Sequence, residues 1–149
     1  LLSAAFTAAF DQFLARKRKH HDDPDPVKAM REGWDDYVNF AAERPRLYAA
    51  MLARILSGAN IAAGIASLEH LAHQVHDVGA RGQLAVPEVQ AAQLAWGSVN
   101  AAAMLHVTAA LGLSARMNEV DPAVIASIKE QMFSAICTSS SSLQQARQG

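Results

Sequence analysis

Three histidines at three-residue intervals are the side chains best placed to bind a metal ion. His70, His73 and His76 fall in one predicted helix, which spreads them over an arc of about 120°. Only His70 and His73 could then share an ion, and zinc needs further ligands. Cys137 is the single cysteine, which excludes a Cys-based zinc site. We expect a solvated polar face without a metal or other cofactor; a metal-binding bundle built on His70 and His73 stays open as an alternative.

Catalytic motifs are missing from the sequence. It contains no Glu-x-x-His pair for a di-iron bundle, no His-Glu-x-x-His, no glycine-rich phosphate loop and no Gly-x-Ser-x-Gly. The net charge is −1, whereas nucleic-acid-binding surfaces normally carry a basic excess. The one basic run, residues 16–19, ends a predicted helix and is expected to be solvated. The sequence therefore predicts neither an enzyme nor a nucleic-acid-binding surface.

Aromatic and flexible apolar side chains recur on the predicted inner faces of several helices. Large rings, methionines and a few polar tips are typical of a pocket for a mostly apolar ligand. Asn100 lies one turn from Trp96 on the same face, and a buried amide needs hydrogen-bond partners. Ordinary core packing is the alternative for each residue. The predicted ligand-binding residues are Trp34, Tyr37, Val38, Tyr48, Met51, Leu52, Ile55, Leu68, Val75, Trp96, Val99, Asn100 and Met104.

Helical periodicity dominates the chain, and strand patterns are almost absent. Asp25-Pro26 and Asp121-Pro122 have the form of an N-cap followed by proline at the first helical position. Gly79 is expected to end the fourth helix in a left-handed conformation. The six predicted helices cover residues 1–19, 26–43, 45–57, 60–78, 87–112 and 122–138.

These helices predict an all-α fold, a six-helix antiparallel bundle in residues 1–141 followed by a disordered Ser/Gln-rich tail in residues 142–149. Apolar residues make up 51% of the chain, enough for a buried core. The lack of a secretory signal and the single cysteine favour the cytoplasm. Residues 89–115 carry no charge and could reach across a bilayer, but they are rich in alanine and polar side chains, so no membrane contact is expected.

Two of the helices are assigned particular faces. In the helix over residues 26–43, Lys28–Glu32 and Arg31–Asp35 are expected to form ion pairs one turn apart on the outer side. The fourth helix is expected to bury one apolar stripe against the core. The residues of that stripe are Ile61, Ile65, Leu68, Ala72 and Val75.

The helix over residues 87–112 is apolar or small on two opposite sides, one more than a single core can cover. The last helix carries a further apolar stripe at heptad-like spacing. Pairing both helices with a second copy would form a four-helix interface with twofold symmetry. The alternative is a central helix enclosed by neighbours from its own chain. The predicted dimer-interface residues are Leu94, Ser98, Leu105, Ala109, Ile125, Ile128, Met132 and Ile136.

Three segments resemble the TetR family of transcriptional regulators. Residues 34–48, WDDYVNFAAERPRLY, resemble the helix–Pro–helix signature of their C-terminal domains. Residues 82–84 and 91–101, GQL and AAQLAWGSVNA, are similar to a subgroup with a Trp-x-x-x-His-Gly motif, with Asn100 and Ala101 where His and Gly are usual. Leu1-Leu2 matches the point where such proteins enter their fourth helix. The resemblance covers the whole chain but only the regulatory domain of the family.

The resemblance implies a homodimer built on the last two helices and a pocket enclosed by the four before them. A small, mostly apolar effector bound in that pocket would release operator DNA, which is held only through an N-terminal helix-turn-helix domain missing here. We therefore expect the effector-sensing and dimerisation domain of a TetR-type repressor. A structural homodimerisation module with no ligand is the alternative.

Overall fold

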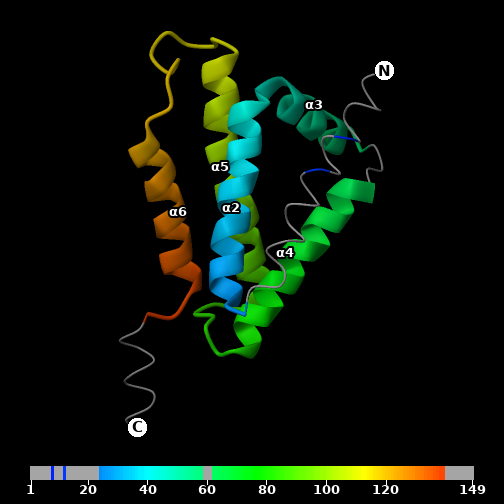
Figure 1. The fold of residues 1–149 in the computed structure, drawn as a ribbon, viewed down its shortest axis with the longest axis vertical. Helices are drawn as coiled ribbons and strands as arrows, with labels where there is room; N and C mark the ends of the chain where they lie inside the picture. The colour runs from blue at the N-terminus through cyan, green and yellow to red at the C-terminus, as the bar shows by residue number, and fades with distance from the viewer. Residues whose placement is uncertain (1–7, 9–11, 13–23, 59–61, 140–149) are drawn as a thin grey trace.

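A computed structural model describes residues 8, 12, 24–58 and 62–139. Every regular element within these ranges is a helix, which confirms the all-α prediction, and each helix begins and ends within two residues of its predicted bounds. The predicted helix over residues 1–19 and the tail over residues 142–149 lie outside the described part. The described helices are α2 (Pro26–Glu43), α3 (Pro45–Leu56), α4 (Ala62–Ala80), α5 (Glu88–Ala110) and α6 (Pro122–Ile136) (Figure 1).

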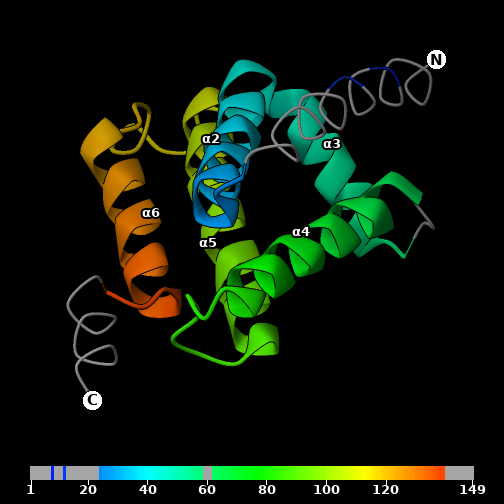
Figure 2. The ribbon, with the colours of Figure 1, turned by 60° about the horizontal axis from the view of Figure 1, so that its bottom comes forward.

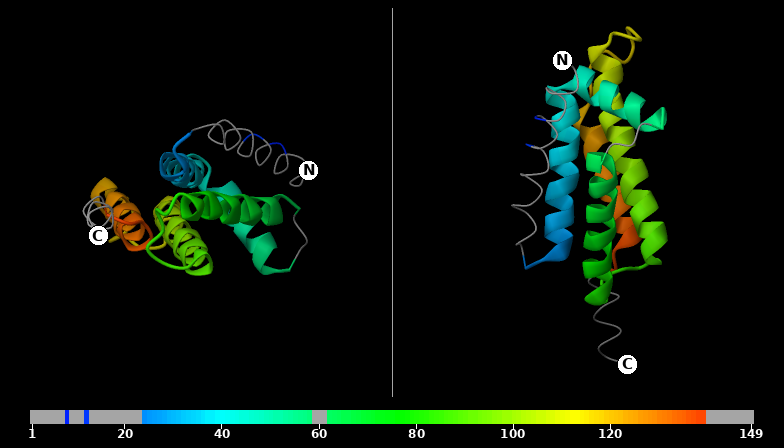
Figure 3. Two further views of the ribbon diagram at one scale, coloured as in Figure 1. Left: turned by 90° about the horizontal axis from the view of Figure 1, so that it is seen from below. Right: turned by 90° about the vertical axis from the view of Figure 1, so that its right-hand side faces the viewer.

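The directions of the helices only partly match an antiparallel bundle. Helices α4, α5 and α6 alternate in direction, as short connections require (Figure 1). Helices α2 and α5, however, run the same way side by side, because α3 carries the chain across one end before α4 returns (Figures 1 and 3). The pair is therefore parallel within an otherwise alternating arrangement.

Helix α5 is the centre of the fold and packs against α2, α3, α4 and α6. In Figure 2, α6 lies on one side of it and α4 on the other. Its fully buried positions include Ala91, Ala102 and Ala103, whose small side chains let neighbouring backbones approach closely. None of the described helices has the length and apolarity needed to cross a membrane. The charge-free stretch of the sequence is therefore the central helix of the bundle.

Aspartate caps begin two of the helices as predicted. The Asp25 carboxylate accepts hydrogen bonds from the backbone N–H groups of Val27 at 3.0 Å and Lys28 at 3.4 Å. The Asp121 carboxylate accepts one from the N–H of Ala123 at 2.9 Å. In both places proline follows, whose missing N–H would have had no partner in the first turn. The cap-and-proline pairs therefore define where these helices begin.

The predicted left-handed cap at Gly79 is wrong. Helix α4 continues to Ala80, and the residue with positive φ is Gly82, at 69°. The N–H of Gln83 then donates to the Val78 carbonyl at 3.1 Å and closes the helix end. Because the helix runs two residues further than predicted, the reversal of the chain moves to the next glycine, which adopts this conformation at no steric cost.

The apolar stripe of α6 packs inside the chain, contrary to the prediction that it faces a second copy. Met132 and Ile136 are buried in the core, and Ile125 and Ile128 pack against it. Phe133, which the sequence analysis did not single out, is 2% exposed and completes this contact. Docking on its own chain therefore buries Met132 and Ile136 and covers Ile125 and Ile128 in part.

Ion pairs across α2 and α6 replace one that was expected within α2. Arg31 donates from Nη1 and Nη2 to the two carboxylate oxygens of Glu130, at 2.7 and 2.9 Å, and Lys129 contacts Asp35 at 2.8 Å. The Arg31 guanidinium also lies 4.6 Å from the ring centroid of Phe133. The predicted Arg31–Asp35 pair is therefore wrong, because both side chains bind α6 instead. The hydrogen bonds raise the pKa of Arg31 and lower that of Glu130.

The predicted pair on the outer side of α2 is present. Lys28 Nζ lies 4.0 Å from Glu32 Oε1. The side chains of Lys28 and Glu32 are 62% and 35% exposed, and exposed pairs of this spacing add only a few tenths of a kcal/mol. The prediction of local ion pairing in α2 thus holds for the outer side alone.

The buried face of α4 is not the predicted one. Ile65 and Leu68 are 52% and 44% exposed, and Ala72 is exposed as well, while Val75 is buried as predicted. Ile61 lies outside the described residues. The residues that face inward also recur at helical spacing, but on the face beside the predicted one. Two of them, Ser67 and Gln74, are polar. These inward residues are Gly64, Ser67, Leu71, Gln74, Val75 and Val78.

A short antiparallel contact ties the loop after α4 to the end of α6. The N–H of Ala85 donates to the Ile136 carbonyl at 2.7 Å, and the N–H of Thr138 donates to the Gln83 carbonyl at 2.9 Å. Cys137, between these residues, is half-buried, and burial raises the pKa of its thiol. The loop and the two helices it joins are therefore linked to the last turn of α6.

We expect Phe133→Ala to destabilise the fold by about 3–5 kcal/mol, because it removes a buried ring from the contact between α6 and the core. The matched change Glu130→Gln removes an exposed ion pair next to it and should cost less than about 1 kcal/mol. Denaturant unfolding followed by circular dichroism measures both. A larger loss for Glu130→Gln would mean that ion pairing, not apolar packing, holds α6 in place.

Candidate functional site

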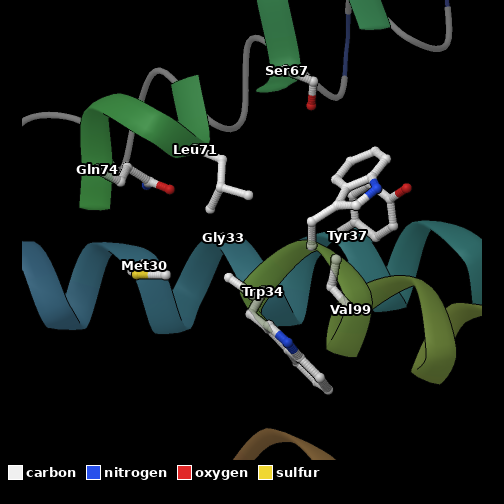
Figure 4. A pocket seen from close by; sticks show the side chains of 10 residues that line it. Met30, Gly33, Trp34, Tyr37, Ser67, Leu71, Gln74 and Val99 are labelled. Carbon is white, nitrogen blue, oxygen red and sulfur yellow. The ribbon is translucent and has the colours of Figure 1, made fainter. Parts of the chain in front are cut away.

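A cavity lies between α2, α4 and α5 (Figure 4). The inner part of the cavity, which only water-sized molecules can enter, has a volume of about 40 Å³. Counting the mouth that opens to solvent, the space between the three helices is about 430 Å³. The residues that line it are Met30, Gly33, Trp34 and Tyr37 of α2, Ser67, Leu71 and Gln74 of α4, and Ala95, Trp96 and Val99 of α5.

The cavity is small in this conformation. Its inner volume can hold a few water molecules, whereas pockets that enclose drug-sized ligands measure roughly 300–1,000 Å³. A ligand enclosed on all sides would need α4 to move away from α2 and α5.

The walls of the cavity are aromatic and uncharged. The Tyr37 and Trp96 rings meet edge to face, with centroids 6.2 Å apart. The indole N–H of Trp34 donates to Ser98 Oγ at 3.1 Å, and the ring points away from the α4 side of the cavity (Figure 4). None of the described residues that line the cavity carries a charge. Such walls suit an uncharged molecule with a flat apolar part.

Asn100 joins three helices beside this cavity. Its carbonyl oxygen accepts hydrogen bonds from the hydroxyls of Tyr37 in α2 and Tyr48 in α3, at 2.7 and 2.5 Å. Its amide nitrogen donates to the Trp96 carbonyl one turn earlier in α5, at 2.8 Å. The two tyrosine rings meet edge to face, with centroids 5.8 Å apart. The partners expected for a buried Asn100 are therefore two phenols and a backbone carbonyl.

The structure brings part of the predicted ligand-binding set together. Four of the predicted residues line the cavity, and two more, Tyr48 and Asn100, adjoin it through the hydrogen bonds above. The remaining inward residues belong to the core away from the cavity, buried or half-buried. The four in the lining are Trp34, Tyr37, Trp96 and Val99. The core residues are Val38, Met51, Val75, Leu52 and Ile55.

Leu68 and Met104 lie outside the cavity, 44% and 41% exposed. Leu68 follows Ser67 on α4 and therefore points about 100° away from the inward face. Met104 is eight residues beyond Trp96, which rotates it by about 80° round α5, out of contact with α2. Their apolar character predicted burial, but their angular positions place them on outer faces.

Six lining residues were not predicted. Met30, Leu71 and Ala95 are apolar, whereas Gly33, Ser67 and Gln74 lack the large apolar side chain expected of a pocket wall. Leu71 and Gln74 follow Ser67 at four- and seven-residue spacing, the repeat of one helix face. This spacing would have identified the inner side of α4 if polar residues had been allowed on a buried face.

The predicted dimer-interface residues on α5 divide into two groups. Leu94 is 42% exposed, whereas Ser98, Leu105 and Ala109 are half-buried, and Ser98 accepts the hydrogen bond from Trp34 inside the chain. The exposed face of α5 carries no charge over several turns. It is formed by Leu94, Gly97, Ala101 and Met104.

The histidines of α4 do not gather into a metal site. Across residues 24–58 and 62–139, no three His, Cys, Asp or Glu side chains lie close enough together to hold an ion. His76 instead contacts Glu88, with 2.9 Å between Nδ1 and Oε1, and links the last turns of α4 to the first turn of α5. His73 points to solvent and His70 is half-buried.

The two tyrosines of the chain, Tyr37 and Tyr48, report on the Asn100 cluster. Burial raises the pKa of both hydroxyls above the ordinary value of about 10, because the charged form would lose solvation. We expect no phenolate absorbance from the folded protein at pH 10, and stability that is full below that pH and falls above it. Ultraviolet titration alongside circular dichroism measures this. Phenolate at pH 10 with the helical signal intact would contradict it.

Comparison with known proteins adds no relative. No protein-family model, no curated protein and no solved structure matches the chain. The resemblance to TetR-type regulators therefore depends on the quoted segments of this sequence. The physical case for a function depends on the cavity, the Asn100 cluster and the exposed face of α5.

Proposed function

We propose that the chain is the effector-sensing and dimerisation domain of a TetR-type transcriptional repressor. The cavity between α2, α4 and α5 carries the proposal, since aromatic and uncharged walls open to solvent beside a polar cluster that joins three helices. The effector is a small, mostly apolar molecule. Operator DNA is bound by a separate helix-turn-helix domain.

The first half of α4 is the part of the wall that can give way. Its buried residues there are Gly64 and Ser67, which contribute little apolar area, whereas Val75 and Val78 anchor the second half in the core. An effector that enters would displace the first half and bind the widened state more tightly than the closed one. That difference in affinity is what a ligand-driven switch requires.

A second copy would bind the exposed face of α5. The apolar stripe of α6 is already used within the chain, so the uncharged surface formed by Leu94, Gly97, Ala101 and Met104 is what remains on the two helices expected to pair. Gly97 offers space for close approach, since a side chain there would contact nothing in its own chain. Close packing of small residues across a twofold axis is a common form of helix pairing.

A structural homodimerisation module with no ligand is the second candidate. The observation that favours it is the inner volume of about 40 Å³, which a densely packed core also leaves. The two functions share the dimer and differ in whether the cavity admits a molecule. Binding therefore separates them.

We expect Gly33→Ala to stabilise the chain by about 1 kcal/mol and to weaken effector binding. Alanine is favoured over glycine within a helix, and its Cβ would lie in the cavity 3.8 Å from Gln74 Nε2, an ordinary contact. Thermal shift with indole, quinoline and naphthol compares the variant with the original chain. Raised melting temperatures for the original chain alone support sensing, whereas no shift for any of the three supports the structural module.

We expect Ala101→Glu to convert a dimer into a monomer, because it places a charge on the exposed face of α5. Ala53→Glu, at an exposed position of α3, is the matched control and should leave the dimer intact. Sedimentation velocity at micromolar concentration measures both. An original chain that sediments as a monomer, or a dimer unaffected by Ala101→Glu, would overturn the proposed interface.

A further inference from the structure

Gln74 is the polar group on the cavity wall that the fold does not use. The residue is 8% exposed, and a Cβ at Gly33 of α2 would lie 3.8 Å from its Nε2 (Figure 4). The amide forms no hydrogen bond with any described residue. Its nitrogen and oxygen keep some exposure, so water in the cavity can hydrate them.

The neighbouring polar groups make the contrast plain. Trp34 donates to Ser98, and both tyrosine hydroxyls donate to Asn100, so the polar tips beside the cavity on α2, α3 and α5 are paired within the chain. The Gln74 amide has no such partner among the described residues, so both its donor and its acceptor are left for a molecule that enters the cavity and replaces water there.

The chemistry of the amide defines what it can bind. A primary carboxamide presents an N–H donor and a carbonyl acceptor side by side in one plane. Its complement is a group with an adjacent carbonyl and N–H in the opposite order, as in a lactam or a cyclic imide. The rings of Tyr37 and Trp96 favour a flat partner, and the absence of charge among the described lining residues favours a neutral one. A carboxylate or an amine would lose its solvation here without an ion partner.

We propose that the cavity binds a flat, uncharged ring compound of the lactam class, held by a pair of hydrogen bonds to the Gln74 amide. This inference rests on the proposed sensing function and names the chemistry of its effector. Gln74 thereby determines specificity, while the aromatic walls supply apolar contact for any flat ring.

Three small lactams test this pairing on the full chain. Carbostyril, the lactam of quinoline, keeps both the N–H and the carbonyl, and N-methylcarbostyril loses the donor. Carbostyril methylated at a ring carbon matches the added bulk while keeping the donor. We expect the original chain to bind the two N–H compounds about tenfold more tightly than N-methylcarbostyril, the effect of one hydrogen bond of ordinary strength. Isothermal titration measures affinity, and the NMR signal of the Gln74 side-chain NH₂ should shift with the N–H compounds.

Gln74→Leu should abolish this preference and leave all three compounds bound equally and weakly. It should unfold at the same or a higher temperature than the original chain, because the unpaired amide is gone. Gln74→Met, with nearly the same shape, serves the same purpose if the leucine variant does not fold. Equal binding of all three compounds by the original chain, or an unchanged preference in Gln74→Leu, overturns the inference.

The failure of this inference is distinct from that of the proposed function. If indole or quinoline binds in a way that Gly33→Ala blocks, and no lactam is preferred, the cavity is a sensor site and the role of Gln74 is wrong. If none of the aromatic compounds binds at millimolar concentration, both fail together.

Discussion

The close packing permitted by the small inner face of α5 determines the rest of the bundle. Ala91, Ala102 and Ala103 are fully buried, and four helices pack around the same cylinder. Alanine contributes little apolar area, so bulky side chains from the surrounding helices have to fill the space between backbones. Trp34 and Tyr37 do so from α2. Large flat rings against a smooth helix leave gaps at their edges, and the cavity is one of these.

The hydrogen bonds of the Asn100 cluster fix the relative position of helices that otherwise meet through apolar contacts. Hydrophobic packing allows helices to slide or rotate with modest loss, whereas two hydroxyls that must meet one oxygen permit a single arrangement. Tyr37 and Tyr48 bring α2 and α3 to the same point on α5. The cost of burying these polar groups is offset because each hydroxyl has its partner. The cluster thus positions α2 and α3, whereas α4 contributes no side chain to it.

Much of the fold could be predicted because residues close in the sequence determine where each helix begins and ends. The Asp-Pro pairs at residues 25–26 and 121–122 start helices through contacts within three residues, and the bounds of α2 agree at both ends. The packing partner of each helix face was harder to predict, because periodicity shows which side of a helix is apolar but not what covers it. The stripe of α6 was real and its partner was wrong. In α4 the inward side carries Ser67 and Gln74, so the rule that apolar residues lie inside selected the wrong side.

The same limit applies to the candidate site. Trp34, Tyr37 and Trp96 were predictable because large rings in helices are seldom left in solvent, and Asn100 because an amide beside them needs partners. The opposite wall came from α4, whose contributing side chains are polar or only half-buried. Gly33 gave no signal at all, since a missing side chain matters only in view of what lies across from it.

Backbone hydrogen bonds join residues 83–85, just before α5, to residues 136–138, at the end of α6. From Gln83 the polypeptide passes up α5 and down α6 and returns to within hydrogen-bonding distance of its starting point. Helices α5 and α6 with their connecting turn thus form a hairpin tied at its open end, while α2 and α3 lie outside the loop and contribute only side-chain contacts to it. The order of helices along this loop is therefore fixed by backbone hydrogen bonds at its ends, whereas α2 and α3 are fixed to it by side chains alone.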